Sequence, residues 1–326
     1  MPEALLGGEA ALRAEAIAAA AKALAASRNP VIAGLMTDMA GAIAALALAR
    51  ATGAALDHAY AGWILRDLDV LRSFGGFLTT PLQTRALADC VLLVGETVPD
   101  FAPSPPTLAP ERTRTVLRLA GAGLGVRLGV LRAVLAGRNI AADAALHALA
   151  ESLRAARFGV AVFSAGELDA LALEMLAGLI ADLNAKTRFF GLPMAAPGNA
   201  VGVMHALAAK TGYPVRIGFA RGEAEHDPWR FDAARMAESG ETDLVLWIGE
   251  SLPEWAERVR LIALVPEGVT LKPMPEVVMF AGKPGIDHAA VLYDAELGTL
   301  AFRRGAGISP SIAEILQSIT KSVQAW

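Results

Sequence analysis

Residues 189–221 read FFGLPMAAPGNAVGVMHALAAKTGYPVRIGFAR, and this stretch decides the fold. Its first part is broken by Pro193, Pro197 and Gly198, and Asn199 then opens a run of small residues. In a parallel α/β protein this order of signals is typical of a strand end, a turn and the start of a helix. The first backbone N–H groups of a helix lack internal partners and attract anions. The stretch therefore predicts a ligand-facing loop at Gly198 and Asn199, with Asn199 as the N-cap.

Strand and helix signals before this stretch indicate a parallel sheet. Residues 30–35 (PVIAGL) form an apolar run, a helical pattern follows to Arg50, and residues 53–58 (GAALDH) read as a second strand. This order predicts a strand–helix–strand unit in a parallel sheet with helices on both faces. Residues 88–96 (ADCVLLVGE) predict a further buried strand. Ligands of such sheets lie beyond the carboxyl ends of the strands. The candidate positions there are Gly34, Asp57, Gly95 and Glu96.

Composition excludes several classes of protein. The net charge of −4 and the isoelectric point near 5.8 argue against a nucleic-acid surface, because phosphate binding needs clustered Lys and Arg. The one cysteine, Cys90, excludes an internal disulfide and an iron–sulfur cluster held by four thiolates of this chain. The start of the chain is unlike a signal peptide, and the longest uncharged window, residues 189–209, is interrupted by Pro, Gly, Asn and His. We expect a cytoplasmic protein that binds neither nucleic acid nor membrane.

The mean hydropathy of the chain is +0.44, which is high for a soluble monomer. Large apolar surfaces are usually covered by partners. The composition therefore predicts that other subunits cover part of this chain.

Motifs of independent catalysis are missing from the sequence. Ser164 lacks the leading glycine of a nucleophile elbow, no phosphate-binding P-loop occurs, and Cys90 lies in an apolar strand, where a thiol is usually inert. Residues 121–125 (GAGLG) follow a predicted strand but lack the spacing of a dinucleotide fingerprint. Asp67 and Asp69 are two residues apart and would diverge on a helix. We expect no catalytic residue in this chain.

A polar segment, residues 221–231 (RGEAEHDPWRF), follows the deciding stretch. Metal sites need ligands that converge on one side, and adjacent His and Asp residues in a loop do not provide this. The segment is therefore interpreted as an ordinary solvated loop, and no metal site is predicted. Two residues of the segment, Arg221 and His226, are kept as candidates for a former ligand pocket.

The strings PGNAVGV, TGYP and FARG, in this order, resemble the pterin-side segment of the B subunit of formylmethanofuran dehydrogenase, a relative of the molybdopterin oxidoreductases. They are still more similar to the B subunit of the formyltransferase/hydrolase complex of methylotrophic bacteria. The resemblance extends through VIAGL, GAALD and TTPLQTRALADCVLLVGETVPD in the first half of the chain. In active family members a Cys or Sec that holds molybdenum or tungsten follows the strand matching GAALD. Here that place reads HAYAGWILRD (58–67), where His58 is the one candidate ligand, interpreted as a satisfied histidine at a strand end.

The resemblance implies an α/β fold with interleaved Rossmann-like parallel-sheet domains of the molybdopterin-oxidoreductase type. The iron–sulfur domain and the C-terminal barrel of active relatives are expected to be lacking. The expected division is an N-terminal helix at 1–28, a first α/β domain at 29–57 plus 155–326, and a smaller α/β domain at 58–154.

The resemblance also implies a non-catalytic structural subunit. Its complex would convert formyl-tetrahydromethanopterin through formylmethanofuran to formate in formaldehyde oxidation, with methanofuran and zinc on other subunits. This chain would hold no molybdopterin and no iron–sulfur cluster, and the other subunits of the complex would be its partners. The nine candidates above would then mark a degenerate pocket. Two alternatives remain open: an active molybdenum or tungsten bis-pterin subunit, and a free-standing Rossmann-like nucleotide-binding module.

Six arginines lie between residues 111 and 138, against one acidic residue. They are Arg112, Arg114, Arg118, Arg127, Arg132 and Arg138. One interpretation is a solvated helix face whose arginine stems cover apolar surface. Since methanofuran in this family carries glutamates, the other is contact with the methanofuran arm or with an acidic neighbour.

Overall fold

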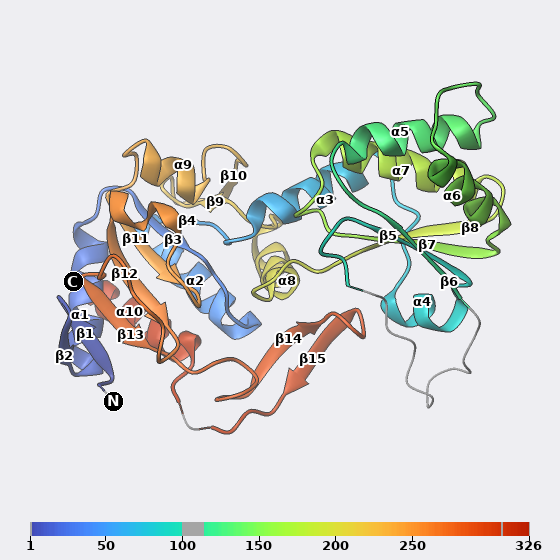
Figure 1. The fold of residues 1–326 in the computed structure, drawn as a ribbon. Helices are drawn as coiled ribbons and strands as arrows, with labels where there is room; N and C mark the ends of the chain where they lie inside the picture. The colour runs from blue at the N-terminus through green and yellow to red at the C-terminus, as the bar shows by residue number, and fades with distance from the viewer. Residues whose placement is uncertain (1, 100–113, 308, 326) are drawn as a thin grey trace. The chain divides into compact units, whose positions relative to one another are not determined.

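The computed structural model describes residues 2–99, 114–307 and 309–325. The chain forms two compact units (Figure 1). Unit 1 comprises Met1–Ala61, Pro197–Tyr293 and Leu300–Trp326. Unit 2 comprises Gly62–Ala196 and Asp294–Thr299. Unit 1 is therefore discontinuous in sequence, because most of unit 2 lies in the sequence between two segments of unit 1.

Unit 1 contains a nine-stranded sheet with the order β10-β9-β4-β3-β11-β12-β13-β1-β2. Its parallel centre consists of β4 (Ala55–Leu56), β3 (Pro30–Ala33), β11 (Leu244–Ile248), β12 (Arg260–Val265) and β13 (Val277–Phe280). Antiparallel strands close both sides: β9 (Ile217–Gly218) and β10 (Glu225–His226) on one, β1 (Ala4–Leu6) and β2 (Glu9–Ala11) on the other. The central strands are apolar runs because both faces of the sheet are covered.

Helices cover the two faces of this sheet. One face packs against α1 (Arg13–Ala26), α2 (Met39–Thr52), α8 (Ala200–Thr211) and α10 (Ile312–Gln324), which share the largest apolar core. The other face packs against α9 (Ala233–Glu238) and the 3₁₀ helix η1 (Glu254–Arg258). Many of the facing residues of α1 and α2 are alanines, which let the helices approach closely. The start of α10 carries a Ser311–Glu314 capping box.

The prediction that residues 1–28 form a separate N-terminal helix is wrong. Helix α1 buries Ala16, Ala20, Ala21 and Leu24 in the core of unit 1, and strand β1 pairs with β13. The prediction failed because β13, the strand that pairs with β1, lies far away in sequence. The N-terminal segment is part of the sheet and its core.

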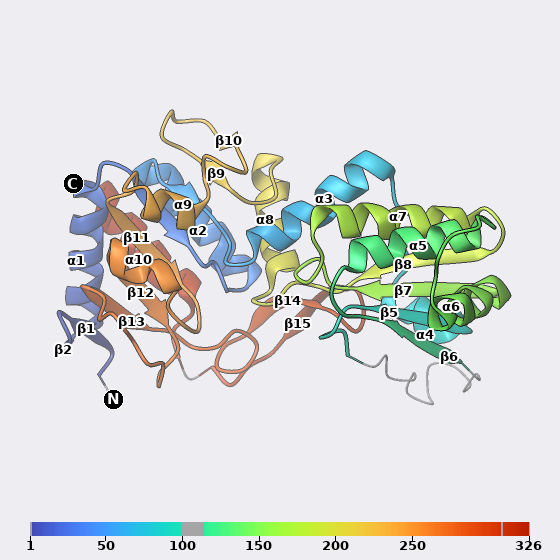
Figure 2. The same ribbon diagram turned by 45° about the horizontal axis from the view of Figure 1, so that its top comes forward.

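Unit 2 is built on a four-stranded parallel sheet with the order β6-β5-β7-β8. Its strands are β5 (Cys90–Val94), β6 (Thr115–Leu119), β7 (Phe158–Phe163) and β8 (Arg188–Pro193). Helices α5 (Leu124–Leu135), α6 (Ala144–Ala155) and α7 (Ala170–Asn184) lie on one face, and α4 (Pro81–Leu87) lies on the other (Figures 1 and 2). Helix α3 (Ala61–Phe74) contributes Trp63 and Val70 to the core beneath α7.

One domain boundary in the structure differs from the predicted one. Residues 155–196 were expected in the first domain, yet β7 pairs with β5 over its full length, from Cys90–Gly159 to Val94–Phe163. Strand β8 then pairs with β7. These parallel pairings join residues 155–196 to unit 2, so the smaller domain predicted at 58–154 extends to Ala196.

A two-stranded hairpin, β14 (Ala290–Asp294) and β15 (Thr299–Arg303), turns at residues 295–298. Among the residues that the structure describes, no helix combines the length and the apolar character that a bilayer crossing requires.

Candidate functional site

The carboxyl ends of the parallel strands are where a ligand is expected in each unit. In unit 1, β3 is followed by β4 on one side and flanked by β11 on the other, which makes the β3–β11 boundary a topological switch point. In unit 2 the corresponding boundary lies between β5 and β7. Candidate residues Gly34, Asp57 and His58 belong to unit 1, while Gly95 and Glu96 belong to unit 2.

Gly34 packs against backbone at the switch point of unit 1. It has a φ of +81°, and a Cβ added there would lie 3.0 Å from the carbonyl carbon of Ile248 and nearer still to its oxygen. The N–H of Met36 donates to the same carbonyl oxygen at 3.1 Å. The end of β11 therefore occupies the space beside Gly34, so that only a glycine fits at this point of the sheet.

The loop at Gly198 and Asn199 is also filled from within the chain. A Cβ at Gly198 would lie 2.8 Å from Cγ of Met36, so the Met36 side chain packs against this glycine. Asn199 is the N-cap residue of α8, as predicted, but its φ is +56° and its side chain makes no capping bond. Instead its Nδ2 donates to the Thr37 carbonyl at 2.8 Å, and its Oδ1 accepts from the Tyr293 N–H at 2.8 Å. Asn199 ties together three segments of unit 1.

His58 is a buried histidine whose two ring nitrogens are both engaged. Nδ1 accepts a hydrogen bond from the Tyr60 N–H at 3.0 Å, which places the proton on Nε2, and Nε2 lies 3.2 Å from the Gly198 carbonyl oxygen. Burial lowers the pKa of His58 to about 4, against the opposing effect of the Gly198 carbonyl. The interpretation of His58 as a satisfied histidine agrees with this geometry, because neither nitrogen has a lone pair directed at a metal.

Acidification is expected to destabilise unit 1 through His58. The folded pKa lies below the ordinary value near 6.5, so the unfolded chain binds the proton first as pH falls from 6.5 towards 4. The stability that His58 contributes is complete above pH 6.5 and declines by about 3 kcal/mol at pH 4. Urea unfolding of the wild type and of His58→Gln at pH 7 and pH 4 measures this, with exposed His147→Gln as the control. Equal pH slopes for the wild type and His58→Gln would contradict it.

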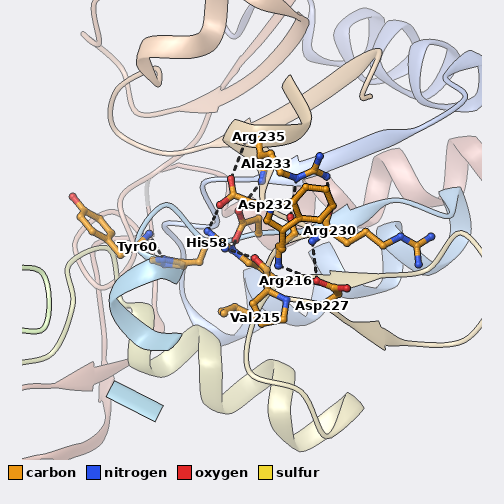
Figure 3. A network of polar contacts seen from close by, with 12 residues as sticks. His58, Tyr60, Val215, Arg216, Asp227, Arg230, Asp232, Ala233 and Arg235 are labelled. Carbon is orange, nitrogen blue, oxygen red and sulfur yellow. Dashed lines mark hydrogen bonds and ion pairs between the residues drawn. The ribbon is translucent and has the colours of Figure 1, made fainter. Parts of the chain in front are cut away.

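Asp57 belongs to a buried ionic network at the end of β4. Figure 3 labels its partners Arg216 and Ala233 and the neighbouring Asp232. Its Oδ1 lies 3.4 Å from Nε of Arg216, and its Oδ2 accepts the Ala233 N–H at 2.9 Å. Arg216 also pairs with Asp232 at 2.5 Å and has a left-handed backbone with a φ of +51°. Burial raises the pKa of Asp57 to about 7, while Arg216 and the Ala233 N–H oppose the rise. Asp57 therefore fixes the start of α9, and both of its oxygens are directed at the protein.

Arg221 and His226 lie apart from the switch point. Arg221 is exposed and pairs with Glu225 at 3.0 Å. Nδ1 of His226 is 2.8 Å from the Val215 carbonyl oxygen, and its ring stacks on Tyr213 with centroids 5.5 Å apart. The predicted loop contains the two-residue strand β10. Within residues 2–99, 114–307 and 309–325, no group of three or more His, Cys, Asp or Glu side chains converges as a metal site would require.

The switch point of unit 2 is closed by a carboxylate that the sequence analysis missed. Glu167, which follows β7, accepts hydrogen bonds from the Glu96 N–H at 2.7 Å, the Thr97 N–H at 3.1 Å and the Thr97 hydroxyl. Gly95 has a φ of +121°, and a Cβ there would lie 2.7 Å from Oε2 of Glu167. Such a row of N–H groups is a binding site for anions, and here the anion is Glu167 itself.

Electrostatics agree with this arrangement of Glu167. Desolvation opposes ionisation, but the hydrogen bonds from Thr97 and Glu96 and the charge of Arg118 outweigh it and hold the pKa of Glu167 below its usual value. Arg118 also donates to the Gly95 carbonyl at 3.0 Å. Candidates Gly95 and Glu96 thus do lie at a turn that binds an anion, and their N–H donors are engaged internally.

The cavity at the carboxyl ends of the strands of unit 1 is small. It has a volume of about 30 Å³ and is lined by residues of the β3, β11, β12 and β13 ends, among them Met36, Gly249 and Pro266. Sites for drug-sized ligands and cofactors measure roughly 300–1,000 Å³. This cavity has room for a few water molecules at most.

Comparison with known proteins identifies relatives of this chain. The chain is 36% identical over 327 residues to the B subunit of the formyltransferase/hydrolase complex Fhc of Methylorubrum extorquens, covering 92% of this chain and 90% of that protein. The chain belongs to the family of Fhc B subunits. A chain in the crystal structure of the formyltransferase/hydrolase complex FhcABCD from the same organism, in complex with methylofuran, is similar with a TM-score of 0.88 and 34% identity, covering 99% of each chain.

The name of a more distant relative includes a metal, tungsten. The B subunit of the tungsten-containing formylmethanofuran dehydrogenase 2 of Methanocaldococcus jannaschii is 24% identical over 220 residues. The match covers 60% of this chain and half of that protein's length. No family model matches the chain. The resemblance drawn from PGNAVGV and the neighbouring strings is confirmed by these relatives.

Most of the arginines in the segment 111–138 are engaged within unit 2. Arg114, Arg118 and Arg127 donate to the carbonyl oxygens of Arg85, Gly95 and Ala120, and Arg132 pairs with Asp182 at 2.7 Å. Arg112 lies outside the described residues. The internal partners support a structural use of these side chains, and contact with a methanofuran arm stays a hypothesis for this chain.

Proposed function

We propose that this chain is a non-catalytic structural subunit of a formyltransferase/hydrolase complex, with the other subunits of the complex as its partners. The observation that carries the proposal is that the chain's own atoms fill both switch points. Ile248 and Met36 fill the one in unit 1, and Glu167 fills the one in unit 2. A chain whose ligand positions are filled by its own residues has little room there for a substrate. In a family of multi-subunit enzymes, such a chain is better suited to a structural role than to a catalytic one.

The proposed complex takes the formyl group of formyl-tetrahydromethanopterin through formylmethanofuran to formate during formaldehyde oxidation in the cytoplasm. Methylofuran is bound in the solved FhcABCD complex. We place the carrier and zinc on the other subunits. By this proposal both sheets descend from a molybdopterin-oxidoreductase type of fold, and the nine candidate residues mark former ligand positions within each unit.

The chemistry of the available ligands supports the absence of a molybdenum or tungsten centre in this proposal. Cys90 is buried in β5, where burial and then the charge of Asp89 raise the pKa of its thiol to about 11. A protonated thiol is a poor ligand for a soft metal. His58 directs both ring nitrogens at backbone. The alternative of an active subunit, which the tungsten-containing relative suggests, would need a strong ligand from one of these two residues.

Co-expression with the neighbouring subunits tests the proposal. We expect the tagged chain to co-purify with them, the complex to release formate, and the chain alone to contain no tungsten, molybdenum or pterin by elemental analysis and fluorescence. His58→Gln should leave the turnover of the assembled complex within about twofold of the wild type. Formylmethanofuran oxidation by the isolated chain, or stoichiometric tungsten in it, would overturn the proposal.

A further inference from the structure

Unit 2 contains an apolar cavity of about 50 Å³ that none of the candidate residues touches. It lies between the end of α3, the loop that follows it, helix α7 and the ends of β7 and β8. The lining side chains are almost all apolar. They are Asp67, Val70, Leu71, Gly75, Gly76, Phe77, Leu78, Phe163, Leu173, Leu176, Ala177, Ile180, Ala181 and Pro193.

The rim of this cavity is apolar, exposed and held in place. Phe77 and Leu78 are 50% and 43% exposed. The backbone that carries them is bonded to β8, since the Gly191 N–H donates to the Phe77 carbonyl at 2.7 Å and the Thr79 N–H donates to the Gly191 carbonyl at 3.0 Å. A rigid pocket with exposed apolar side chains around it is typical of the centre of a protein–protein interface.

Asp67 is the one ionisable residue that lines the cavity. Desolvation raises the pKa of Asp67 to about 7, although the positive charge of the neighbouring Arg66 acts to lower it. The other charged residues on the packed elements do not line the cavity: Asp69 pairs with Arg72 in solvent, and Glu174 and Asp182 of α7 are not part of the lining. A carboxyl group at the edge of an apolar cavity can accept a charge-assisted hydrogen bond from a cation that enters the cavity.

The volume of the cavity restricts what can enter. Each water-sized group needs roughly 10–15 Å³ of such volume, so about 50 Å³ accepts a chain of about four heavy atoms. The end of a lysine side chain has this length, with an apolar stem and a compact ammonium group. The planar guanidinium of arginine is wider and carries more donors than one carboxyl group can satisfy.

We infer that the cavity is a docking pocket for a lysine of a neighbouring subunit, with the ammonium group paired to the Asp67 carboxylate and the stem against Leu173, Leu176 and Phe77. This inference rests on the proposed function, because it needs a partner subunit. It assigns a position and a chemistry to one contact of that assembly. Phe77 and Leu78 would then be buried in the complex.

Asp67→Asn and Asp69→Asn form a matched pair of variants for the test. Both remove one charge from the same helix, but Asp69 is an exposed residue paired with Arg72. We expect Asp67→Asn to weaken binding of the neighbouring subunits about tenfold or more, since a partly buried charge pair is lost, and Asp69→Asn to change it less than twofold. Wild-type affinity should rise between pH 6 and pH 8 as Asp67 ionises, and the rise should be absent in Asp67→Asn.

Carbodiimide cross-linking of the purified complex identifies the occupant. The reagent joins a paired carboxylate and ammonium group as an amide, with loss of water, so mass spectrometry should find Asp67 joined to a lysine of another subunit. Intersubunit cross-links that never include Asp67, together with unchanged affinity of a folded Asp67→Asn, would overturn the inference while leaving the proposed function intact. A chain that purifies without partners would remove both.

Discussion

Gly34→Ala is expected to unfold unit 1 or to destabilise it by about 4 kcal/mol or more. The added methyl group would collide with the carbonyl of Ile248 at the end of β11, and the φ of +81° adds the strain of a left-handed alanine. The colliding atoms belong to backbone in the middle of the sheet, so neither strand can move aside without breaking its pairing. Denaturant unfolding followed by the fluorescence of Trp247, buried in the same sheet, measures the loss.

Gly212→Ala is the matched control for this prediction. Gly212 has the same φ of +81°, and a Cβ there meets nothing within 4 Å. It should cost about 1–2 kcal/mol, the strain of the backbone alone. Equal losses for the two variants would show that the switch point of unit 1 has space beside Gly34 after all. That result would also weaken the proposed function, because a ligand could then approach there.

Arg216→Ala is expected to destabilise unit 1 by about 1–2 kcal/mol more at pH 8 than at pH 5, because it leaves the Asp57 carboxylate buried without its cation. The folded pKa of Asp57 is already raised to about 7, so its contribution to stability is complete below the unfolded pKa near 4 and is lost as pH rises through 7. Removing Arg216 raises this pKa further and enlarges the penalty at high pH only.

Two further variants separate the charge effect from lost packing. Arg221→Ala removes an exposed arginine with one surface ion pair and should cost less than about 1 kcal/mol. Asp57→Asn combined with Arg216→Ala should recover part of the stability at pH 8, because no buried charge remains. A loss for Arg216→Ala that is the same at pH 5 and pH 8 would mean that its contacts with Asp232 and Pro228 matter more than Asp57 does.

The parts of the fold that the sequence predicts well are those with continuous apolar runs. Strands β5 and β11 are buried along their whole length, so their composition alone reveals them. The N-terminal hairpin of β1 and β2 was missed because its strands have three residues each, although Gly7 and Gly8 between them are a turn signal. The position of residues 155–196 was missed because strand order in a sheet depends on pairing between distant segments, which one sequence does not record.

The position of the candidate site could be predicted from the sequence, but the side chains that fill it could not. Gly34 and Gly95, predicted at strand ends, lie at the switch points, and Asp57 lies at the end of β4. The interpretation of His58 as an engaged histidine followed from its place at a strand end. The residues that fill these positions come from elsewhere in the chain. Glu167 lies about seventy residues from the turn that it occupies, and Arg216 reaches Asp57 from a separate segment. Side chains that arrive from distant parts of the chain leave no local pattern.

The discontinuity of unit 1 has a consequence for how the polypeptide is made on the ribosome. Ala4 of β1 pairs with Met279 of β13, so the first strand waits for nearly the whole chain, on the order of 15 to 55 s at ordinary translation rates. The four-stranded sheet of unit 2 is complete as soon as Pro193 has emerged. Nascent protein should therefore contain a folded unit 2 while α1, β3 and α2 remain without their sheet. During that interval the apolar faces of these early segments are substrates for molecular chaperones.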